Sequence, residues 1–537
     1  MREQAKEYLR TALRDPNAAF RAGQWEAIEN AVVQKGRLLL VQRTGWGKSI
    51  VYFIATRLLR DEGAGPTLLI SPLLALMRNQ IEAAERINIR AATINSDNPD
   101  DWDAVLQELK NDRVDILLVS PERLANIDFL EKYLLPVARK IGLFVVDEAH
   151  CISDWGHDFR PDYRRIVRIL KVLPRNIPVL ATTATANDRV IKDVVGQLGS
   201  GLEVSRGPLV RESLRLQNII MPNQAARMAW LAGILPRIRG SGIIYTLTVA
   251  DAERVAEWLR SQGINAKAYH SRLTEGREAL EQALLANEVK ALVATTALGM
   301  GFDKPDLRFV IHFQRPGSVV HYYQQVGRAG RKLDNAYGVL LCGEEDDDII
   351  EYFIRTAFPP EDQVHRILEA LEGADEGLSI PQLEVKVNLS RGQLDKVMKL
   401  LAVEAPSPVV KDGSKWYRST EEYTLNEERI KRLKDIRHHE LRRMQEYTKH
   451  KGCLMRFLSE ELDDPDAGKC GKCAGCNGGP ILPETYSQGM LTKALDFLKR
   501  SELPIEPRKQ WPKGALVTYG FAGNIAPELK PEVGRAL

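Results

Sequence analysis

The strongest chemical signal in the chain is a short loop with the residues needed to hold phosphate groups. An apolar run at 38–41 leads into Thr44-Gly45-Trp46-Gly47-Lys48-Ser49, and a helical pattern follows. Glycines let backbone N–H groups wrap around phosphates, and a helix start adds a positive end. Lys48 can reach the outer phosphates of a nucleotide, and the Ser49 hydroxyl can ligate Mg²⁺. We therefore predict a nucleotide site at Thr44, Gly45, Gly47, Lys48 and Ser49, although Gln42 stands where the strict motif has glycine.

A second signal is the pair of adjacent carboxylates in Asp147-Glu148-Ala149-His150, which follows the apolar run 143–146. Two neighbouring carboxylates are costly in an apolar setting unless a metal ion and solvent are near. Asp147 can hold Mg²⁺ through water, and Glu148 can polarise an attacking water molecule. Thr183-Ala184-Thr185 ends the next apolar run, where its hydroxyls can link such a site to a neighbouring domain or only cap a turn.

A third signal lies much later in the chain, in the segment 324–331, which reads Gln-Gln-Val-Gly-Arg-Ala-Gly-Arg. Phosphoryl transfer develops negative charge on the outer phosphate, and arginine donates paired hydrogen bonds to such groups. Arg328 and Arg331 would complete the nucleotide site if the part of the chain that carries them closed onto the loop, coupling hydrolysis to motion. A glycine-flanked surface turn is the other interpretation.

These residues need a scaffold, and the first ~345 residues alternate short apolar runs with helical patterns, as in parallel sheets buried under helices. Two such sets in tandem indicate two α/β lobes, with the division near 205–208. Helices and a short strand pair then follow Pro359-Pro360, which suggests a winged helix. The predicted strands are 38–41, 67–70, 116–119, 143–146 and 179–181 in the first set, and 242–245, 291–294, 309–313 and 338–341 in the second.

Composition limits the classes of protein that fit. The 537 residues have a net charge of +3 and no apolar run near the ~20 residues of a membrane span, and the first ten residues do not resemble a signal peptide. We expect a cytoplasmic protein.

Between residues 429 and 456, the chain has ten Lys and Arg but only three Asp and Glu, an excess of positive charge that suits a phosphate backbone or a solvated helix face. Four of the six cysteines, Cys453, Cys470, Cys473 and Cys476, lie within 24 residues, a clustering that favours metal over disulfides.

Taken together, these motifs resemble those of the RecQ family of superfamily 2 DNA helicases. Residues 14–345 look like its tandem RecA-like motor. Residues 20–24, Phe-Arg-Ala-Gly-Gln, resemble its adenine-reading motif, with Gln24 on the base and Arg21 stacking. The segments 71–73 and 120–124, and 294–301 in the second lobe, resemble motifs that track the nucleic-acid backbone. The 324–331 segment resembles its arginine-finger motif.

The most diagnostic stretch is 150–161, which is similar to the family's aromatic-rich loop that senses single-stranded DNA and switches on hydrolysis. Trp155 and Phe159 offer stacking faces, each worth about 1–3 kcal/mol per base. Arg160 can meet a phosphate, and His157 can hydrogen-bond within the loop or to the strand. The resemblance thus implies a DNA-sensing set of His150, Trp155, His157, Phe159 and Arg160.

The four cysteines resemble the family's zinc module, and four thiolates give a closed site with a structural role. The chain departs from the family in three ways: Asn17 replaces an aromatic residue, Arg43 and Trp46 replace proline and glycine, and the winged helix precedes the cysteines. That order looks like a RecQ-like subgroup with a C-terminal phosphoribosyltransferase-like module, which is not visible here. We predict RecA-like lobes at 1–206 and 207–350, a winged helix at 360–425, a helical zinc-binding module at 426–480, and a linker or partial module at 481–537.

The sequence therefore predicts an ATP-dependent DNA helicase that uses ATP, Mg²⁺ and Zn²⁺ and acts as a monomer on single-stranded and tailed duplex DNA. The resemblance implies 3′ to 5′ movement and a role in DNA repair or recombination, with nucleoid association if the source is bacterial. Its catalytic residues would be Lys48, Asp147, Glu148, Arg328 and Arg331. Two alternatives remain: an RNA-directed motor, since Asp-Glu-Ala-His also occurs there, and a non-catalytic DNA-binding scaffold.

Overall fold

The computed structural model describes residues 1–72, 78–94, 101–126, 129–153, 163, 165–199, 201–273, 276–299, 302–404, 406–500, 503–505, 507, 511, 525–532 and 534–536. The chain forms two compact units that do not follow its linear order. The larger unit contains Met1–Pro222, Ile234–Asp346 and Ile436–Glu484, and the smaller one contains Asn223–Gly233, Asp347–Asp435 and Thr485–Leu537. Within the described residues, no helix is long and apolar enough to cross a membrane.

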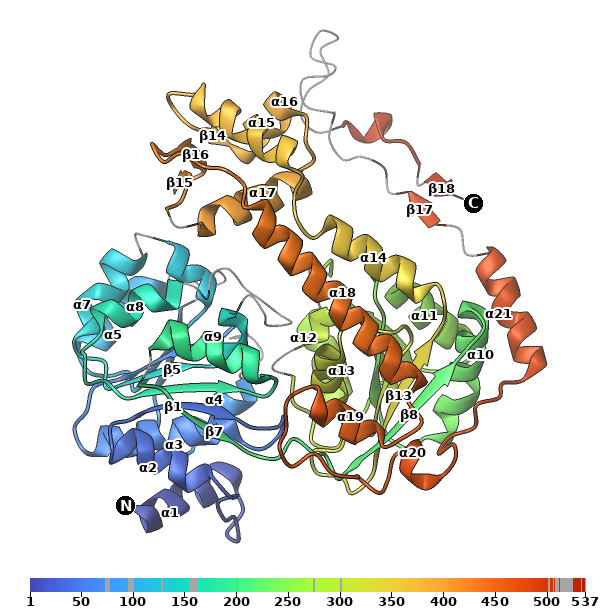
Figure 1. The fold of residues 1–537 in the computed structure, drawn as a ribbon, viewed down its shortest axis with the longest axis horizontal. Helices are drawn as coiled ribbons and strands as arrows, with labels where there is room; N and C mark the ends of the chain where they lie inside the picture. The colour runs from blue at the N-terminus through green and yellow to red at the C-terminus, as the bar shows by residue number, and fades with distance from the viewer. Residues whose placement is uncertain are drawn as a thin grey trace. The chain divides into compact units, whose positions relative to one another are not determined.

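The first lobe is built on a seven-stranded parallel sheet in the order β3-β4-β2-β5-β6-β1-β7. Figure 1 labels β1, β5 and β7 of this sheet. Its strands are β1 (Arg37–Val41), β2 (Thr67–Ile70), β3 (Ala91–Ile94), β4 (Ile116–Val119), β5 (Leu143–Val146), β6 (Val179–Thr183) and β7 (Glu203–Arg206). Its helices are α1 (Arg2–Leu13), α2 (Gln24–Val32), α3 (Lys48–Asp61), α4 (Arg78–Glu85), α5 (Trp102–Lys110), α7 (Leu135–Ala138), α8 (Ile166–Val172) and α9 (Asp188–Leu198).

Both faces of this sheet are buried, because successive side chains of a strand point to opposite faces. In β1, Leu38 and Leu40 belong to the apolar core that contains α1, α2 and α3, whereas Leu39 and Val41 belong to the core that contains α5, α8 and α9. The two helical layers are visible on either side of the sheet in Figure 1. This arrangement explains why the central strands are continuous apolar runs in the sequence.

The second lobe has a six-stranded parallel sheet in the order β10-β11-β9-β12-β13-β8. The two α/β lobes predicted from the sequence are therefore confirmed. Its strands are β8 (Leu214–Ile220), β9 (Gly242–Tyr245), β10 (Ala266–Tyr269), β11 (Ala291–Ala294), β12 (Phe309–His312) and β13 (Ala336–Cys342). The helices in this part of the chain are α10 (Gln224–Ile234), α11 (Val249–Ser261), α12 (Arg277–Leu285), α13 (Val319–Val326) and α14 (Asp346–Thr356).

In the smaller unit, three helices and a three-stranded antiparallel sheet have the element order of a winged helix. The helices are α15 (Glu361–Glu372), α16 (Ile380–Val387) and α17 (Arg391–Val403), and the sheet joins β14 (Leu378–Ser379), β16 (Lys415–Arg418) and β15 (Val409–Asp412). Ser379 and Ser390 each form a capping box, with Gln382 and Gln393, that fixes where α16 and α17 begin. The remaining elements are α18 (Glu427–Lys449), α19 (Leu454–Glu460), α20 (Ala474–Asn477), α21 (Gln488–Arg500), β17 (Leu503–Ile505) and β18 (Gly534–Ala536).

Candidate nucleotide site

The phosphate loop lies between β1 and α3, at the carboxyl end of the sheet. Gly45 and Gly47 have φ angles of 77° and 100°, a left-handed region that glycine enters without strain. Among the described residues, no side chain caps the start of α3, so its first N–H groups remain available to an anion. Lys48 Nζ donates to Gln42 O at 2.9 Å, which folds the lysine back over the loop. The geometry suits the phosphates of a nucleotide.

The carboxylates meet this loop because β6 lies between β5 and β1 in the sheet. Asp147 directly follows β5, and its Oδ1 accepts hydrogen bonds from Thr182 Oγ1 at 2.6 Å and from the Glu148 backbone N–H at 3.0 Å. His150 Nδ1 lies 3.0 Å from Thr183 Oγ1 and 3.3 Å from Glu148 Oε2. The hydroxyls of β6 therefore join the acidic motif in a single buried network.

Burial governs the charges of this network. It raises the pKa of Asp147 to about 6, and the adjacent charge of Glu148 acts in the same direction. Burial also acts to raise the pKa of Glu148, but the hydrogen bond from His150 and the charges of His150 and Lys48 hold it below its ordinary value. The pKa of Lys48 is lowered by burial. The carboxylate of Asp147 and the hydroxyl of Ser49 are hard oxygen ligands, so this pair fits Mg²⁺, whose charge would relieve the clustering of acids.

The arginine-bearing segment of the second lobe follows α13 and lies against the phosphate loop. Arg331 Nη1 pairs with Asp303 Oδ1 at 2.7 Å, and a Cβ added to Gly45 would lie 3.2 Å from Arg331 Cγ. Arg328 is buried and donates from Nη1 to Phe302 O at 3.1 Å. The positive charge of Arg331 acts to lower the pKa of Lys48, and the positive charge of Arg328 acts to lower the pKa of Glu148. The structure thus brings both predicted arginines to the site that holds the predicted lysine and carboxylates.

The two residues predicted to read adenine, Arg21 and Gln24, contact the loop, but polar groups of both are engaged within the chain. Gln24 is 3% exposed; its Oε1 accepts from the Arg21 backbone N–H at 2.9 Å, and its Nε2 donates to Trp46 O at 3.0 Å. Arg21 Nη1 donates to Gly45 O. The role of Gln24 at the base therefore remains a prediction.

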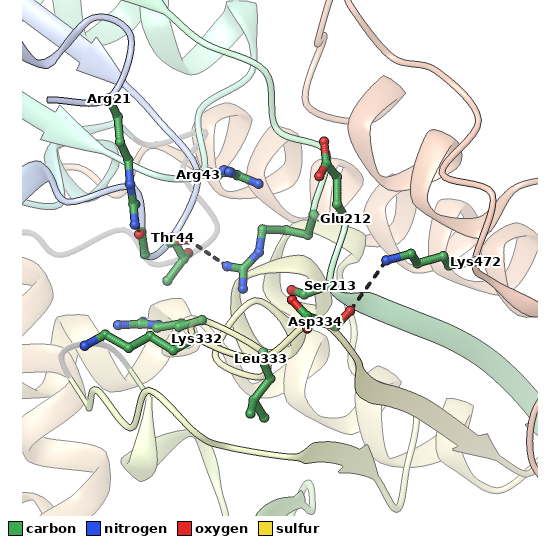
Figure 2. Close-up of a pocket in the computed structure, with 13 residues that line it drawn as sticks. Arg21, Arg43, Thr44, Glu212, Ser213, Lys332, Leu333, Asp334 and Lys472 are labelled. Atoms are coloured by element: carbon green, nitrogen blue, oxygen red, sulfur yellow. Dashed lines mark hydrogen bonds between the residues drawn. The ribbon is translucent and has the colours of Figure 1, made fainter. Parts of the chain in front are cut away.

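A pocket of about 420 Å³ adjoins the loop, and Figure 2 shows Arg21, Arg43 and Thr44 on one side of it and Lys332 and Asp334 on the other. Most of its charged lining is basic, which suits an anionic ligand. Its charged residues are Arg21, Arg43, Arg211, Arg331, Lys332 and Lys472, together with the acidic Glu212 and Asp334. Lys472, which lies between Cys470 and Cys473 in the sequence, also lines the pocket and donates to Asp334 O at 3.5 Å.

Most of the predicted DNA-sensing loop lies outside the described residues, including Trp155, His157, Phe159 and Arg160. His150 is placed beside Glu148, as described above. At the far end of the loop, Tyr163 is buried and its hydroxyl donates to Asp147 O at 3.0 Å. Tyr163 is not among the residues predicted for the site, and its only signal in the sequence is its position shortly after the aromatic-rich stretch. The chain just beyond the loop therefore contacts the acidic motif, whose last residue, His150, begins the loop.

The four clustered cysteines converge on a single point. Their Sγ atoms all lie within 4.8 Å of one another, and individual pairs are 3.6 Å (Cys453 and Cys470), 3.9 Å (Cys473 and Cys453) and 4.0 Å (Cys470 and Cys476) apart. A tetrahedron with zinc–sulfur bonds of ~2.3 Å has edges of about 3.8 Å. Backbone N–H groups of Leu454, Arg456 and Cys470 donate to these sulfurs, as thiolate ligands require. The cluster fits a closed zinc site.

The segment 436–484, which contains the four cysteines and is called the cysteine module here, shares its core with the second lobe. Tyr447 packs on Tyr322 with ring centroids 5.2 Å apart, and the Asn218 side chain donates to Tyr447 O at 2.7 Å. The module also contacts the first lobe, where Arg206 donates to Asp463 O and Leu462 O, each at 2.9 Å. It is therefore built into the larger unit, which the linear order of the sequence did not reveal.

Comparison with known proteins agrees with this geometry. Residues 21–194 match the DEAD/DEAH box helicase family, and residues 226–332 match the helicase conserved C-terminal domain. The ATP-dependent DNA helicase RecQ of Bacillus subtilis is 35% identical over 349 residues, which cover 64% of this chain and 57% of that protein. The probable ATP-dependent DNA helicase RecS of Bacillus subtilis is 30% identical over 489 residues, which cover 89% of this chain and 93% of that protein. The chain belongs to the RecQ family.

The extent of the match differs among RecQ relatives. The putative ATP-dependent DNA helicase Q1 of Caenorhabditis briggsae is 38% identical over 324 residues, covering 58% of this chain and 51% of that protein. The chain thus spans about half the length of several RecQ relatives it matches. Solved structures show the fold alone: Mss116p bound to single-stranded RNA and AMP-PNP has a TM-score of 0.55 at 18% identity, covering 75% of this chain and 90% of that one. Lhr of Mycobacterium smegmatis, bound to single-stranded DNA and AMP-PNP, has a TM-score of 0.51 at 20% identity, covering 78% and 60%.

Proposed function

We propose that this RecQ-family chain is an ATP-dependent DNA helicase that moves 3′ to 5′ on single-stranded DNA and separates the strands of tailed duplexes during DNA repair or recombination. The observation that carries the proposal is the placement of Arg331 beside Gly45, within a site that also contains Lys48, Asp147 and Glu148. A site assembled from two lobes can couple the hydrolysis of ATP to their relative motion.

Each residue of the site has a role that its position supports. The backbone of the phosphate loop and Lys48 bind the phosphates, while Ser49 and Asp147 would hold Mg²⁺, which supplies charge neutralisation at the transferred phosphate. Glu148 orients and polarises the attacking water, and His150 keeps the Glu148 carboxylate ionised through their contact. Arg328 and Arg331 meet the charge that develops on the outer phosphate, an effect worth about 10³–10⁵ in kcat where it has been measured.

The nucleic-acid partner is assigned through the aromatic-rich loop. Trp155 and Phe159 supply stacking faces for unpaired bases, and stacking tolerates any base, so we propose binding with low sequence specificity. The buried contact between Tyr163 and Asp147 O supports a route from that loop to the acidic motif. The four cysteines would hold one Zn²⁺ ion with a structural role, because a closed set of four thiolates leaves no position for substrate.

The first experiment is steady-state ATP hydrolysis without nucleic acid, with single-stranded DNA and with RNA of matched sequence. Stimulation by DNA alone supports the proposal, and equal stimulation by RNA favours an RNA-directed motor. The Lys48→Ala variant should lose hydrolysis while keeping DNA binding. Lys35→Ala is the matched control, because Lys35 is an exposed lysine of the same lobe that pairs with Glu62. Hydrolysis that survives Lys48→Ala would refute the assigned site.

Two further measurements test the finer parts of the proposal. Trp155→Ala should lose stimulation by DNA while basal hydrolysis is retained, and stimulation that persists would refute the role of the loop. Duplexes with a single 3′ tail or a single 5′ tail test polarity. Unwinding of only the 3′-tailed duplex is expected, whereas preference for the 5′ tail would reject the proposed direction.

A further inference from the structure

The phosphate loop and the linker between the two lobes exchange hydrogen bonds through two neighbouring arginines. Arg43, in the loop, donates from Nη1 to Val210 O at 2.9 Å, and Arg211, in the linker, donates from Nη1 to Thr44 O at 2.7 Å. Residues 43–44 thus bond residues 210–211 in both directions. Arg43 stands where the sequence resemblance predicts proline, whose side chain has no donor. The hydrogen bond from Arg43 to Val210 O therefore depends on a residue in which this chain departs from the family pattern.

Arg211 also reaches the arginine-bearing segment of the second lobe. Its Nη1 donates to Gly327 O at 2.8 Å, and its Nη2 donates to Ala329 O at 2.9 Å. These two carbonyls lie on either side of Arg328 in the chain. One guanidinium therefore binds the phosphate loop and both flanks of an arginine that is proposed to meet the outer phosphate. Its planar set of donors suits three acceptors at fixed angles, which a lysine ammonium cannot reproduce in the same geometry.

The linker that carries Arg211 is itself held on both sides. Tyr323, on α13, donates from its hydroxyl to Leu209 O at 2.6 Å. Asp464, in the cysteine module, accepts from the Leu209 backbone N–H at 2.8 Å. Arg211 is 4% exposed, and its three acceptors are main-chain carbonyls. A buried side chain on a fixed base can set the distance between two loops more closely than one on a free linker.

We propose that Arg211, supported by Arg43, is a positioning residue that holds the arginine-bearing segment in register with the phosphate loop, so that Arg328 reaches the outer phosphate when the lobes close. The proposal rests on the proposed ATP hydrolysis. Arg211 lines the basic pocket, but its hydrogen bonds go to Thr44 O, Gly327 O and Ala329 O, so the role assigned to it is to position these segments. Its effect is therefore expected on turnover, with binding of ATP largely kept.

The test compares Arg211→Ala, Arg211→Lys and Arg43→Ala with Arg215→Ala as the matched control. Arg215 belongs to the adjoining strand β8 and donates from Nε to Asn335 Oδ1 at 2.9 Å, away from the loop. We expect Arg211→Ala to lower the kcat of DNA-stimulated hydrolysis by about tenfold or more, with KM and the Kd of a fluorescent ATP analogue changed less than about threefold. Arg211→Lys should restore little, Arg43→Ala should lower kcat less than Arg211→Ala does, and Arg215→Ala should match the parent.

A double-variant cycle separates positioning from general stability. If Arg211 acts through Arg328, the loss of kcat in Arg211→Ala/Arg328→Ala should be much smaller than the product of the two single losses. Multiplicative losses, or a kcat of Arg211→Ala within twofold of the parent, would overturn the proposal. If the thermal transition shows that Arg211→Ala does not fold, the same two criteria, the loss of kcat and its combination with Arg328→Ala, are applied to Arg211→Lys and Arg43→Ala. A parent protein without any ATP hydrolysis would instead refute the proposed function.

Discussion

Thr182 Oγ1 donates a hydrogen bond of 2.6 Å to Asp147 Oδ1, from the strand that lies between the acidic motif and the phosphate loop. This bond fixes the orientation of the carboxylate that would hold Mg²⁺, and it favours the ionised form of a buried acid. Thr182 precedes the Thr183-Ala184-Thr185 motif, so the hydroxyl that contacts Asp147 is one residue earlier than the motif itself suggests.

Replacing Thr182 by valine should therefore impair catalysis while preserving the fold, because valine has nearly the shape of threonine. A hydrogen bond to a charged group contributes about 1.5–3 kcal/mol, so kcat is expected to fall by about tenfold or more. Steady-state hydrolysis at saturating DNA and Mg²⁺ measures the change. Thr56→Val is the control, because Thr56 is a buried threonine that bonds Tyr52 O and Thr67 Oγ1. Equal loss in both variants would mean that the effect is structural.

Glu148→Gln should abolish turnover and leave nucleotide binding intact. The amide keeps the shape of the side chain but cannot polarise water as a carboxylate does, so kcat should fall by about 10²-fold or more, the range of general-base contributions. Binding of a fluorescent ATP analogue should change little, since Lys48 and the loop are untouched. Residual turnover within about tenfold of the parent would remove Glu148 from the assigned role.

The sequence predicted the central strands of both lobes and missed those at the edges. Strands β2, β4, β5, β9 and β11 begin and end at the predicted residues. The four strands that went unpredicted, β3, β7, β8 and β10, are the two outermost strands of each sheet. An edge strand has one unpaired side and a partly exposed face, as the burial of β7 and β10 shows. It therefore lacks the continuous apolar run by which central strands were identified.

Residues of the candidate site whose type implies a chemistry could be predicted from the sequence, and residues that contribute only through their position could not. Lys48, Asp147, Arg328 and the cysteines have side chains whose spacing indicates a function. Arg211 and Tyr163 donate to main-chain carbonyls of residues outside their own local segments, 167 and 16 positions away, and such contacts leave no local pattern. The hydrogen bond from Gln24 Nε2 to Trp46 O is likewise a tertiary contact.

Asp115 should make the stability of the first lobe sensitive to acid. Its carboxylate, 2% exposed, accepts from Arg60 Nε at 2.8 Å and from Arg90 Nη2 and the Arg90 backbone N–H at 2.8 Å each. Burial acts to raise the pKa of Asp115, but the bonds from Arg90 and Arg60 outweigh it and hold the pKa well below its ordinary value. A depressed pKa stabilises the fold above the unfolded-state pKa of ~3.9, and this contribution is lost as the pH falls below that value.

Asp115→Asn should therefore destabilise the protein at neutral pH, by about 3–5 kcal/mol if it behaves like other broken buried ion pairs. Thermal transitions measured from pH 7 to pH 3 should show the gap between parent and variant narrowing at the acid end. Asp61→Asn is the comparison, because Asp61 forms a more exposed ion pair with Arg57 and should cost much less. A gap that stays constant over this pH range would contradict the assigned ionisation.

The cysteine module gives the last prediction, because it is packed into the core of the second lobe. Purified protein should contain about one zinc ion per chain, and Cys473→Ser should remove it, since the buried Cys473 sulfur is one of the four that would ligate it. The variant should also melt at a lower temperature, because Tyr447 and Phe457 of the module pack in the same core as Tyr322. Cys342→Ser is the matched control: Cys342 is buried in β13, where its thiol donates to Ile219 O, and its loss should leave the zinc content unchanged. The parent protein could instead contain no metal and melt at the same temperature as Cys473→Ser. That result would show that the four thiols hold the module together by packing alone.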